Sequence, residues 1–123
     1  MEFTGIHHAS LEVANTRRSL DFYQTLLGMT VMEDRPQLGF PGAWIQLGTQ
    51  QLHLLELPTT GECPQDQPDH TGRGRHTALV VTDIGALKAR LERYNIPYTV
   101  SRSGRNALFC RDPDGNGLEF IQA

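Results

Sequence analysis

The chain has 123 residues, of which 38% are hydrophobic, and a formal net charge of -3 at pH 7. This length is enough for one ordinary globular domain with a hydrophobic core. The slightly acidic balance argues against nucleic acid as a partner, because a polyanion is bound by clusters of Lys and Arg. No apolar run approaches the length needed to span a bilayer, and the polar start is no signal peptide. We therefore expect a cytoplasmic protein that does not engage membranes.

One sequence pattern occurs twice in the chain. Residues 5–13 (GIHHASLEV) and 74–81 (GRHTALVV) align when His8 is laid on His76. Each segment predicts a strand, and in both halves a helix, a Gly or Asn stop, another strand and a hairpin of two strands follow. This order predicts two tandem βαβββ units in a single domain, 1–123. Unit 1 is expected at about 4–58 and unit 2 at about 74–123, joined by a linker, 59–73.

In the first half, the side chains of residues 5–13 are expected to alternate between the two faces of a strand. His7 shares the apolar face with Ala9, Leu11 and Val13, which leaves His8 on the more polar face. A helix is expected over 18–27, capped by Asn15 or Thr16, with Leu20, Tyr23, Leu26 and Leu27 as its apolar stripe and Gly28 at its end. Strands are predicted at 29–32, 43–47 and 52–57.

The second half repeats this plan. After a strand over 75–81, Asp83 is expected to cap a helix that presents Ile84, Leu87, Leu91 and Tyr94 on one side and stops at Asn95 and Pro97. Strands follow at 98–101, 107–111 and 117–121, with a tight turn at 112–115.

The segment 58–74 between the halves is polar and rich in Gly and Pro. It is expected to be mobile or to fold over a site as a lid, and its His70 is interpreted as a solvated loop histidine. Cys63 and Cys110 form no Cys-x-x-Cys pair, and both are interpreted as reduced thiols, with Cys110 a small filler of its strand.

Four potential metal ligands occupy equivalent strand positions in the two halves. His8 corresponds to His76 in the first strands, and His53 lies near the position of Glu119 in the last strands. If the halves pair about a pseudo-twofold axis, these strands converge, and three imidazoles and a carboxylate suit divalent Zn, Ni, Co, Mn or Fe. The alternative for each is a hydrogen-bonded core residue, but duplication gives no reason to place buried polar groups symmetrically.

Three segments resemble the vicinal oxygen chelate superfamily, which includes glyoxalase I, bleomycin and fosfomycin resistance proteins and extradiol dioxygenases. These are Ile6-His-His-Ala-Ser-Leu11, the helix motif Arg18-Ser-Leu-Asp-Phe-Tyr with Leu-Leu-Gly-Met29, and Arg111-Asp-Pro-Asp-Gly-Asn-Gly-Leu-Glu119. The resemblance implies an α+β fold in which paired βαβββ units form a cupped, mostly antiparallel mixed sheet with the helices outside. It further implies one divalent metal ion held by His8, His76 and Glu119, and a homodimer in which the site is often shared between chains.

The first-unit ligand departs from that family pattern, because glyoxalase I-like members carry Glu or Gln where this chain has His53. Glu56 and His7 are ranked second as ligands, since strand parity puts both on the helix-packed face. Trp44, Arg102 and Arg105 are candidate substrate contacts. The alternatives are a core position for Trp44 and solvated charges for the two arginines.

The resemblance implies a glyoxalase I-like lyase or isomerase that chelates two neighbouring oxygens of a small-molecule substrate, with Glu119 carrying a proton at the adjacent carbon. Glu12 counts against glutathione as the substrate, because bacterial glyoxalase I commonly has an arginine near this point. Two alternatives stay open. One is an Fe(II) extradiol-type dioxygenase, and the other is a non-catalytic antibiotic-binding protein.

Overall fold

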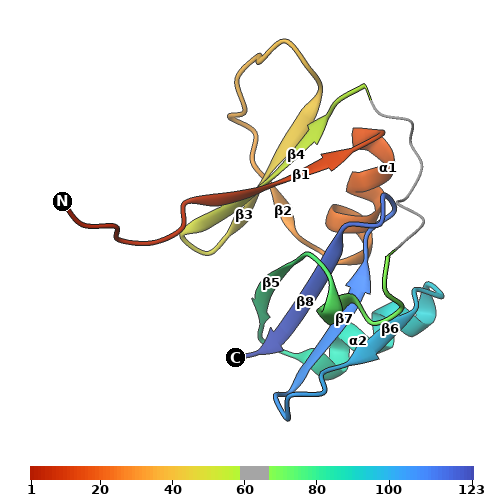
Figure 1. Ribbon diagram of the computed structural model, residues 1–123. Helices are drawn as coiled ribbons and strands as arrows, with labels where there is room; N and C mark the ends of the chain where they lie inside the picture. Colours follow the sequence, from red (N-terminus) through yellow and green to blue (C-terminus); the bar gives the residue numbers. More distant parts are fainter. Residues whose placement is uncertain (59–66) are drawn as a thin grey trace. The chain divides into compact units, whose positions relative to one another are not determined.

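The computed structural model of the chain describes residues 1–58 and 67–123. The chain divides into two compact units, Met1–Gly61 and Glu62–Ala123, and each contains its own four-stranded sheet (Figure 1). The predicted α+β class and the duplicated βαβββ order are confirmed. Residues 59–66 of the segment predicted to be mobile or a lid, among them Cys63, lie outside the described residues. Among those that are described, no helix is long and apolar enough to cross a membrane.

The first unit contains two short consecutive helices and four strands. In chain order these are β1 (His8–Val13), α1 (Thr16–Leu20), the π-helix η1 (Asp21–Leu26), β2 (Thr30–Val31), β3 (Gly42–Leu47) and β4 (Gln50–Glu56). The strand order is β1-β4-β3-β2. β1 runs parallel to β4, and the other two pairings are antiparallel.

The second unit repeats this arrangement after a short 3-10 helix. Its elements are η2 (Thr71–Arg73), β5 (His76–Val81), α2 (Ile84–Arg93), β6 (Tyr98–Val100), β7 (Ala107–Arg111) and β8 (Gly117–Gln122). The strand order is β5-β8-β7-β6, with β5 parallel to β8 and the remaining pairs antiparallel.

The two sheets also share one register. In the first unit His53 lies between Ser10 on β1 and Trp44 on β3. In the second unit Glu119 lies between Ala78 on β5 and Phe109 on β7. The first strands begin at His8 and His76, which come two residues before Ser10 and Ala78 respectively. Equivalent positions of the two units therefore match residue by residue.

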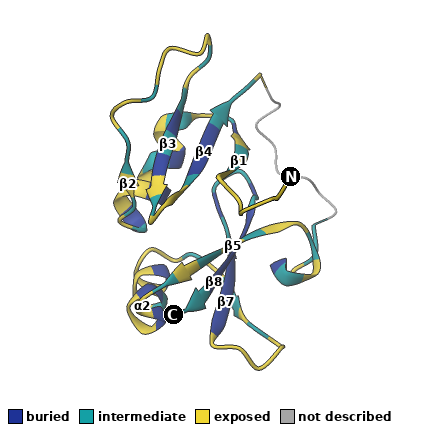
Figure 2. Ribbon diagram, turned by 90° about the vertical axis from the view of Figure 1, so that its left-hand side faces the viewer, coloured by how far each residue is buried: buried dark blue, intermediate teal, exposed yellow. Residues whose placement is uncertain are grey.

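One face of each sheet carries the core, because side chains on a strand alternate between the faces. On that face the buried strand positions are apolar in both units, and Figure 2 shows how burial follows the strands. In the first unit they include Val13, Ala43, Ile45, Leu52 and Leu54, and in the second Leu108, Cys110, Leu118 and Phe120. The helices contact the last strand of their own unit, which leaves the opposite face of each sheet for polar side chains.

Both helices begin at a side-chain cap, and each is joined to the last strand of its unit by a second hydrogen bond. Asn15 and Asp83 accept from backbone N–H groups in the first turns of α1 and α2. Glu56 Oε1 accepts from the Thr16 N–H at 2.7 Å, and Gln122 Oε1 accepts from the Ile84 N–H at 2.8 Å. These bonds satisfy N–H groups that a helix start leaves without a partner.

The predicted helix at 18–27 is wrong in its detail. The chain turns from α-helix to π-helix at Asp21, where the Leu27 N–H donates to the carbonyl of Phe22, five residues earlier. The wider turn rotates the buried side, so Phe22 is buried with Tyr23 and Leu26. The expected stripe residues Leu20 and Leu27 are only half-buried. Gly28 follows with φ of 74° and ends the segment as predicted.

In the second unit, α2 matches its prediction at the N-terminus and through its core stripe. Ile84, Leu87 and Leu91 are buried, while Tyr94 is exposed. Asn95 takes the left-handed conformation, with φ of 57°, that ends the helix.

Candidate functional site

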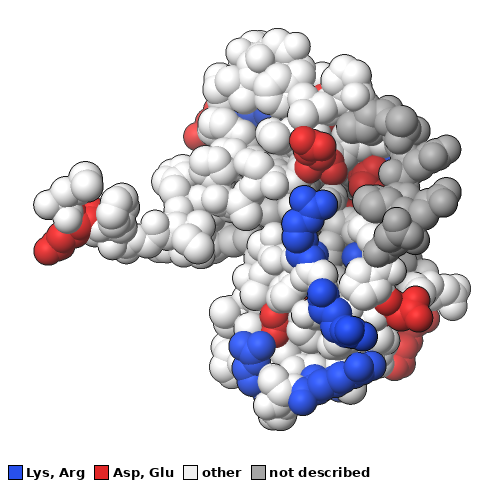
Figure 3. Space-filling model, viewed as in Figure 1, with Lys and Arg blue, Asp and Glu red and all other residues white. Residues whose placement is uncertain are grey.

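Each sheet turns one row of polar and aromatic side chains away from its helix. These rows hold the residues that the sequence singles out: His8, His53 and Trp44 in the first unit, and His76 and Glu119 in the second. The charges around them differ. Only three of the eleven Lys and Arg residues, Arg17, Arg18 and Arg35, lie in the first unit. Figure 3 shows basic side chains gathered over the second unit.

The first unit presents a stack of three rings, here called the ring column. His53 lies between His8, whose ring centroid is 4.0 Å away at an interplanar angle of 15°, and Trp44, at 4.6 Å and 9°. His53 is 8% exposed, and its Nε2 donates to the side-chain oxygen of Gln51 at 2.8 Å. Trp44 therefore lies on the open face rather than in the core.

The surroundings of His53 favour its neutral form. Burial is the largest cause that lowers its pKa, and the neighbouring imidazoles of His8 and His7 and the charge of Arg35 lower the pKa further. A neutral imidazole has a lone pair for a metal ion. A metal lies in the plane of the imidazole that binds it, however, so two stacked rings do not aim their lone pairs at one point. Ligation by both His8 and His53 requires one ring to turn.

The second unit presents an acid pair, His76 and Glu119, at the equivalent place. Glu119 is only 2% exposed, and its Oε2 lies 3.2 Å from His76 Nε2. His76 Nδ1 donates to the carbonyl of Gly74 at 2.8 Å, which leaves Nε2 as the nitrogen that faces the carboxylate. A histidine that ligates a metal commonly gives its other N–H to a backbone carbonyl in this way.

The acid pair fits a divalent cation. An unprotonated Nε2 and a carboxylate oxygen both present lone pairs, so their approach to 3.2 Å requires a proton or a metal ion between them. Two ligands on one zinc-sized ion stand about 3 to 3.4 Å apart. Among the described residues Glu119 Oε1 is also a buried oxygen without a hydrogen-bond partner, and such an atom is a natural cation ligand.

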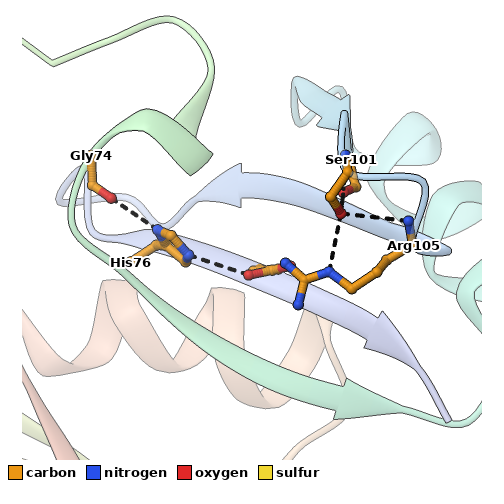
Figure 4. A network of polar contacts seen from close by, with 6 residues as sticks. Gly74, His76, Ser101 and Arg105 are labelled. Carbon is orange, nitrogen blue, oxygen red and sulfur yellow. Dashed lines mark hydrogen bonds and ion pairs between the residues drawn. The ribbon is translucent and has the colours of Figure 1, made fainter.

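Arg105 provides the positive charge that faces this carboxylate. Its Nη2 lies 3.2 Å from Glu119 Oε1, and its side chain is 57% exposed. The contact is an ion pair without the angle of a hydrogen bond, since Oε1 accepts none. The guanidinium is held from the other side, because Arg105 Nε donates to Ser103 Oγ at 3.1 Å and Ser103 Oγ lies 2.8 Å from Ser101 Oγ (Figure 4).

The other residues singled out by the sequence lie elsewhere. Glu56, the second-ranked ligand, caps α1 on the helix side of its sheet. His7 is exposed just before β1 and pairs with His8, with 2.8 Å between their Nδ1 atoms. Arg102 is exposed in the same hairpin as Arg105. Cys110 is buried, and that burial raises the pKa of its thiol to about 12, so it is a core thiol.

The prediction that His70 is a solvated loop histidine is wrong. His70 is 9% exposed, its Nδ1 hydrogen bonds with Thr99 Oγ1 at 2.6 Å, and its ring meets Phe109 edge-on at 4.8 Å. His76 packs on the same phenylalanine at 5.4 Å. Phe109 pairs with Glu119 across β7 and β8, so the alternation of side chains along the strands could have placed it on the same face from the sequence. No periodic signal marks His70, because it lies in a loop.

A hollow of about 420 Å³ adjoins this group within the second unit. Its walls come from the segment that leads into η2, from the edge strand β6 and from its neighbour β7, and they include Pro68, Thr71, Thr99, Phe109 and Arg111. Arg111 ties two of these parts together by donating to the carbonyls of Pro68 and Gly115.

Each unit by itself brings two of the four predicted ligands together. His8 and His53 meet in the first unit, and His76 and Glu119 meet in the second. In neither unit do the described residues gather three His, Cys, Asp or Glu side chains that could hold a metal ion. A metal ion bound by one unit alone would therefore have two of the four predicted ligands.

Comparison with known proteins places these features in a family. Residues 5–120 match the Glyoxalase/Bleomycin resistance protein/Dioxygenase superfamily. The chain is 32% identical to a lactoylglutathione lyase of Neisseria meningitidis over 94% of its own length and 88% of the relative's. It is 27% identical to glyoxylase I 4 of Arabidopsis thaliana over 98% and 71%. A glyoxalase family protein from Bacillus anthracis shares the fold, with a TM-score of 0.81 at 21% identity over 99% and 97% of the two chains.

Proposed function

The chain belongs to the Glyoxalase/Bleomycin resistance protein/Dioxygenase superfamily, and we propose that it is a divalent-metal-dependent lyase or isomerase of the glyoxalase I type. Its substrate is a small molecule with two neighbouring oxygens. His8, His76 and Glu119 hold the metal ion, and His53 joins them once its ring leaves the stack. The metal is Zn, Ni, Co, Mn or Fe in the divalent state.

The observation that carries this proposal is the acid pair. The 3.2 Å approach of His76 Nε2 to Glu119 Oε2 sets two donors at the spacing of neighbouring ligands. The tautomer of His76 is fixed by Gly74, and Glu119 Oε1 lacks a hydrogen bond among the described residues. A histidine–carboxylate pair with a purely structural role would be expected to have both carboxylate oxygens hydrogen-bonded.

Glu119 carries the chemistry of proton transfer. Its carboxylate has two oxygens in different surroundings, so one can hold the cation while the other accepts a proton from the substrate carbon and returns it to the neighbouring carbon. At 2% exposure the side chain of Glu119 is shielded from bulk water. When bound, the metal supplies Lewis-acid stabilisation of the oxyanion that develops as the proton leaves.

Substrate contacts are assigned to Trp44, Arg102 and Arg105. The indole of Trp44 ends the ring column and offers an apolar surface. The two arginines lie in one exposed hairpin of the second unit, where a guanidinium can meet an anionic group of the substrate.

A second candidate function is an Fe(II) ring-cleaving dioxygenase, which the family name also covers. The ring column favours it, because His53 is sandwiched and hydrogen-bonded to Gln51. While His53 stays there, the remaining donors are two histidines and one carboxylate, the ligand set of non-haem Fe(II) oxygenases.

A homodimer is the proposed assembly. Met1, Phe3 and Ile6 are strongly exposed apolar residues in an extended segment that precedes β1 (Figure 1). Exposed apolar side chains of this size commonly mark a surface that another chain covers. Light scattering on the purified protein measures the mass directly.

Two assays on metal-loaded protein distinguish the functions. The first follows hydrogen–deuterium exchange at the carbon beside the carbonyl in hemithioacetals of an α-ketoaldehyde, made with glutathione and with a neutral thiol. The second follows oxygen uptake with a catechol. Exchange without oxygen uptake supports the isomerase, and uptake without exchange supports the dioxygenase. Protein purified without added metal that holds no divalent ion and binds none contradicts both.

A further inference from the structure

We propose that Arg105 is a displaceable counter-ion: it neutralises Glu119 in the metal-free protein, and a divalent cation takes its place. This inference rests on the proposed function, because it assumes that Glu119 binds a metal ion. It concerns a residue that acts through Glu119, and so it assigns Arg105 a positioning role in addition to any contact with substrate.

The first step is the charge of Glu119. A carboxylate that is 2% exposed is costly to bury unless an opposite charge faces it. Arg105 provides that charge at 3.2 Å from Oε1, while His76 faces only Oε2. Without a metal ion, Arg105 is therefore the permanent positive group beside the acid pair.

The second step is the weakness of that contact. Arg105 meets Oε1 without forming a hydrogen bond, and its side chain is 57% exposed. Little burial has to be undone when the guanidinium leaves. Glu119, in contrast, is fixed in the middle of the sheet between β5 and β7, so the arginine is the mobile member of the ion pair.

The third step is that a metal ion and the guanidinium exclude each other. A divalent cation at the acid pair would stand within a few ångströms of the Nη2 atom, and two positive groups so close repel strongly where the carboxylate is shielded from water. The cation has the greater charge and shares Glu119 with His76. Arg105 is then released from Oε1.

The hairpin is built to hold the released side chain. Arg105 Nε donates to Ser103 Oγ at 3.1 Å, and the Ser103 hydroxyl lies 2.8 Å from that of Ser101 (Figure 4). This anchor binds the guanidinium at Nε and leaves its two terminal nitrogens available. Metal binding therefore frees a guanidinium that stays close to the metal-bound carboxylate.

The test compares Zn²⁺ affinity at pH 8 in the wild type, Arg105→Gln and Arg102→Gln, by competition with a chromogenic chelator. Arg102→Gln removes the same charge from the same hairpin but no contact with Glu119. We expect Arg105→Gln to bind Zn²⁺ about tenfold more tightly, equivalent to about 1.4 kcal/mol, and Arg102→Gln to match the wild type. The melting temperature should rise more on Zn²⁺ addition in Arg105→Gln than in the wild type, because its metal-free form has lost its counter-ion.

The outcomes separate this inference from the proposed function. A wild type that binds Zn²⁺ while Arg105→Gln binds equally or more weakly overturns the displacement and leaves the metal enzyme intact. An equal gain in Arg102→Gln overturns it as well, since the effect would then be general charge. If no variant binds Zn²⁺ or another divalent ion, both proposals fail together.

Discussion

The two units of this protein share a register but differ in chemistry. At equivalent positions the first unit places His53 between Ser10 and Trp44, whereas the second places Glu119 between Ala78 and Phe109. The first unit consequently presents a stack of rings in which the pKa of His53 is lowered. The second presents a buried charge with partners on both sides.

This difference shows what duplication preserves. Strand pairing is set by backbone hydrogen bonds and by the buried apolar face, so it survives replacement of side chains on the open face. The open face is free to diverge. The result is one unit with a stack of three rings and one with a buried carboxylate that faces a histidine and an arginine.

The largest expected effect comes from removing the charge of Glu119, the buried carboxylate that the second unit has where the first unit has His53. Glu119→Gln keeps the shape of the side chain but cannot accept a proton, so we expect substrate proton exchange to fall about 10²- to 10⁴-fold, the usual contribution of a general base. Exchange followed by NMR on metal-loaded protein measures it. Glu56→Gln is the matched control, because Glu56 lies on the helix face. Equal exchange in Glu119→Gln and the wild type would remove Glu119 from the mechanism.

A second prediction asks whether the two pairs contribute equally to metal binding. His76 already faces Glu119, whereas His53 is stacked and hydrogen-bonded to Gln51. We therefore expect His76→Ala to weaken metal binding by at least about 100-fold, more than loss of a supporting group usually costs. His53→Ala should cost less than about tenfold. Isothermal titration with Zn²⁺ measures both.

The control for this comparison is another buried histidine, His70, whose Nδ1 hydrogen bonds with Thr99 Oγ1. His70→Ala, which removes the ring on Phe109, should leave the Zn²⁺ dissociation constant unchanged in folded protein. Equal losses in His53→Ala and His76→Ala would show that the ring column opens fully on binding and that the two units act alike.

The sequence alone could predict the fold and the facing of the candidate ligands. Alternation along the strands put His8 and Glu119 opposite the apolar side chains, and duplication related the two halves. The two-residue period of a strand is enough for this prediction, because the face on which a side chain lies depends only on its position in the strand.

The rest of the site depends on contacts between segments that have no period. The widening of the first helix at Asp21, the burial of His70 under Thr99 and the approach of Arg105 to Glu119 each arise from a loop or an irregular turn. Strand parity says nothing about such positions. The interpretation of Arg105 as either a substrate contact or a solvated charge missed its pairing with Glu119 for this reason.

A third, smaller prediction concerns the tie between helix and sheet that the two units share. Glu56→Ala and Gln122→Ala each leave a helix N–H without its acceptor, so each should lower the free energy of unfolding by about 0.5 to 2 kcal/mol. Glu56→Ala should cost more, because a carboxylate also interacts favourably with the start of a helix. Urea denaturation followed by circular dichroism measures both. No loss in either variant would show that water replaces the acceptor fully.

The smallest expected effect is a pH dependence that the ring column confers on the first unit. Burial and the neighbouring histidines hold the pKa of His53 below its ordinary value of 6.5. As pH falls through that value, the unfolded chain binds a proton that folded His53 resists, so the free energy of unfolding falls until the folded pKa is reached. Above pH 7 both forms are neutral and the effect vanishes.

His53→Gln removes this titration while keeping a polar side chain in the stack. Urea denaturation of metal-free protein from pH 8 to pH 5 should therefore show a shallower loss of stability in His53→Gln than in the wild type, with the two curves parallel above pH 7. His70→Gln, which removes a buried histidine of the second unit, tests whether any lost imidazole has the same result. Identical slopes in the wild type and His53→Gln would mean that folded His53 accepts a proton as readily as it does in the unfolded chain, and the ring column would then not favour its neutral form.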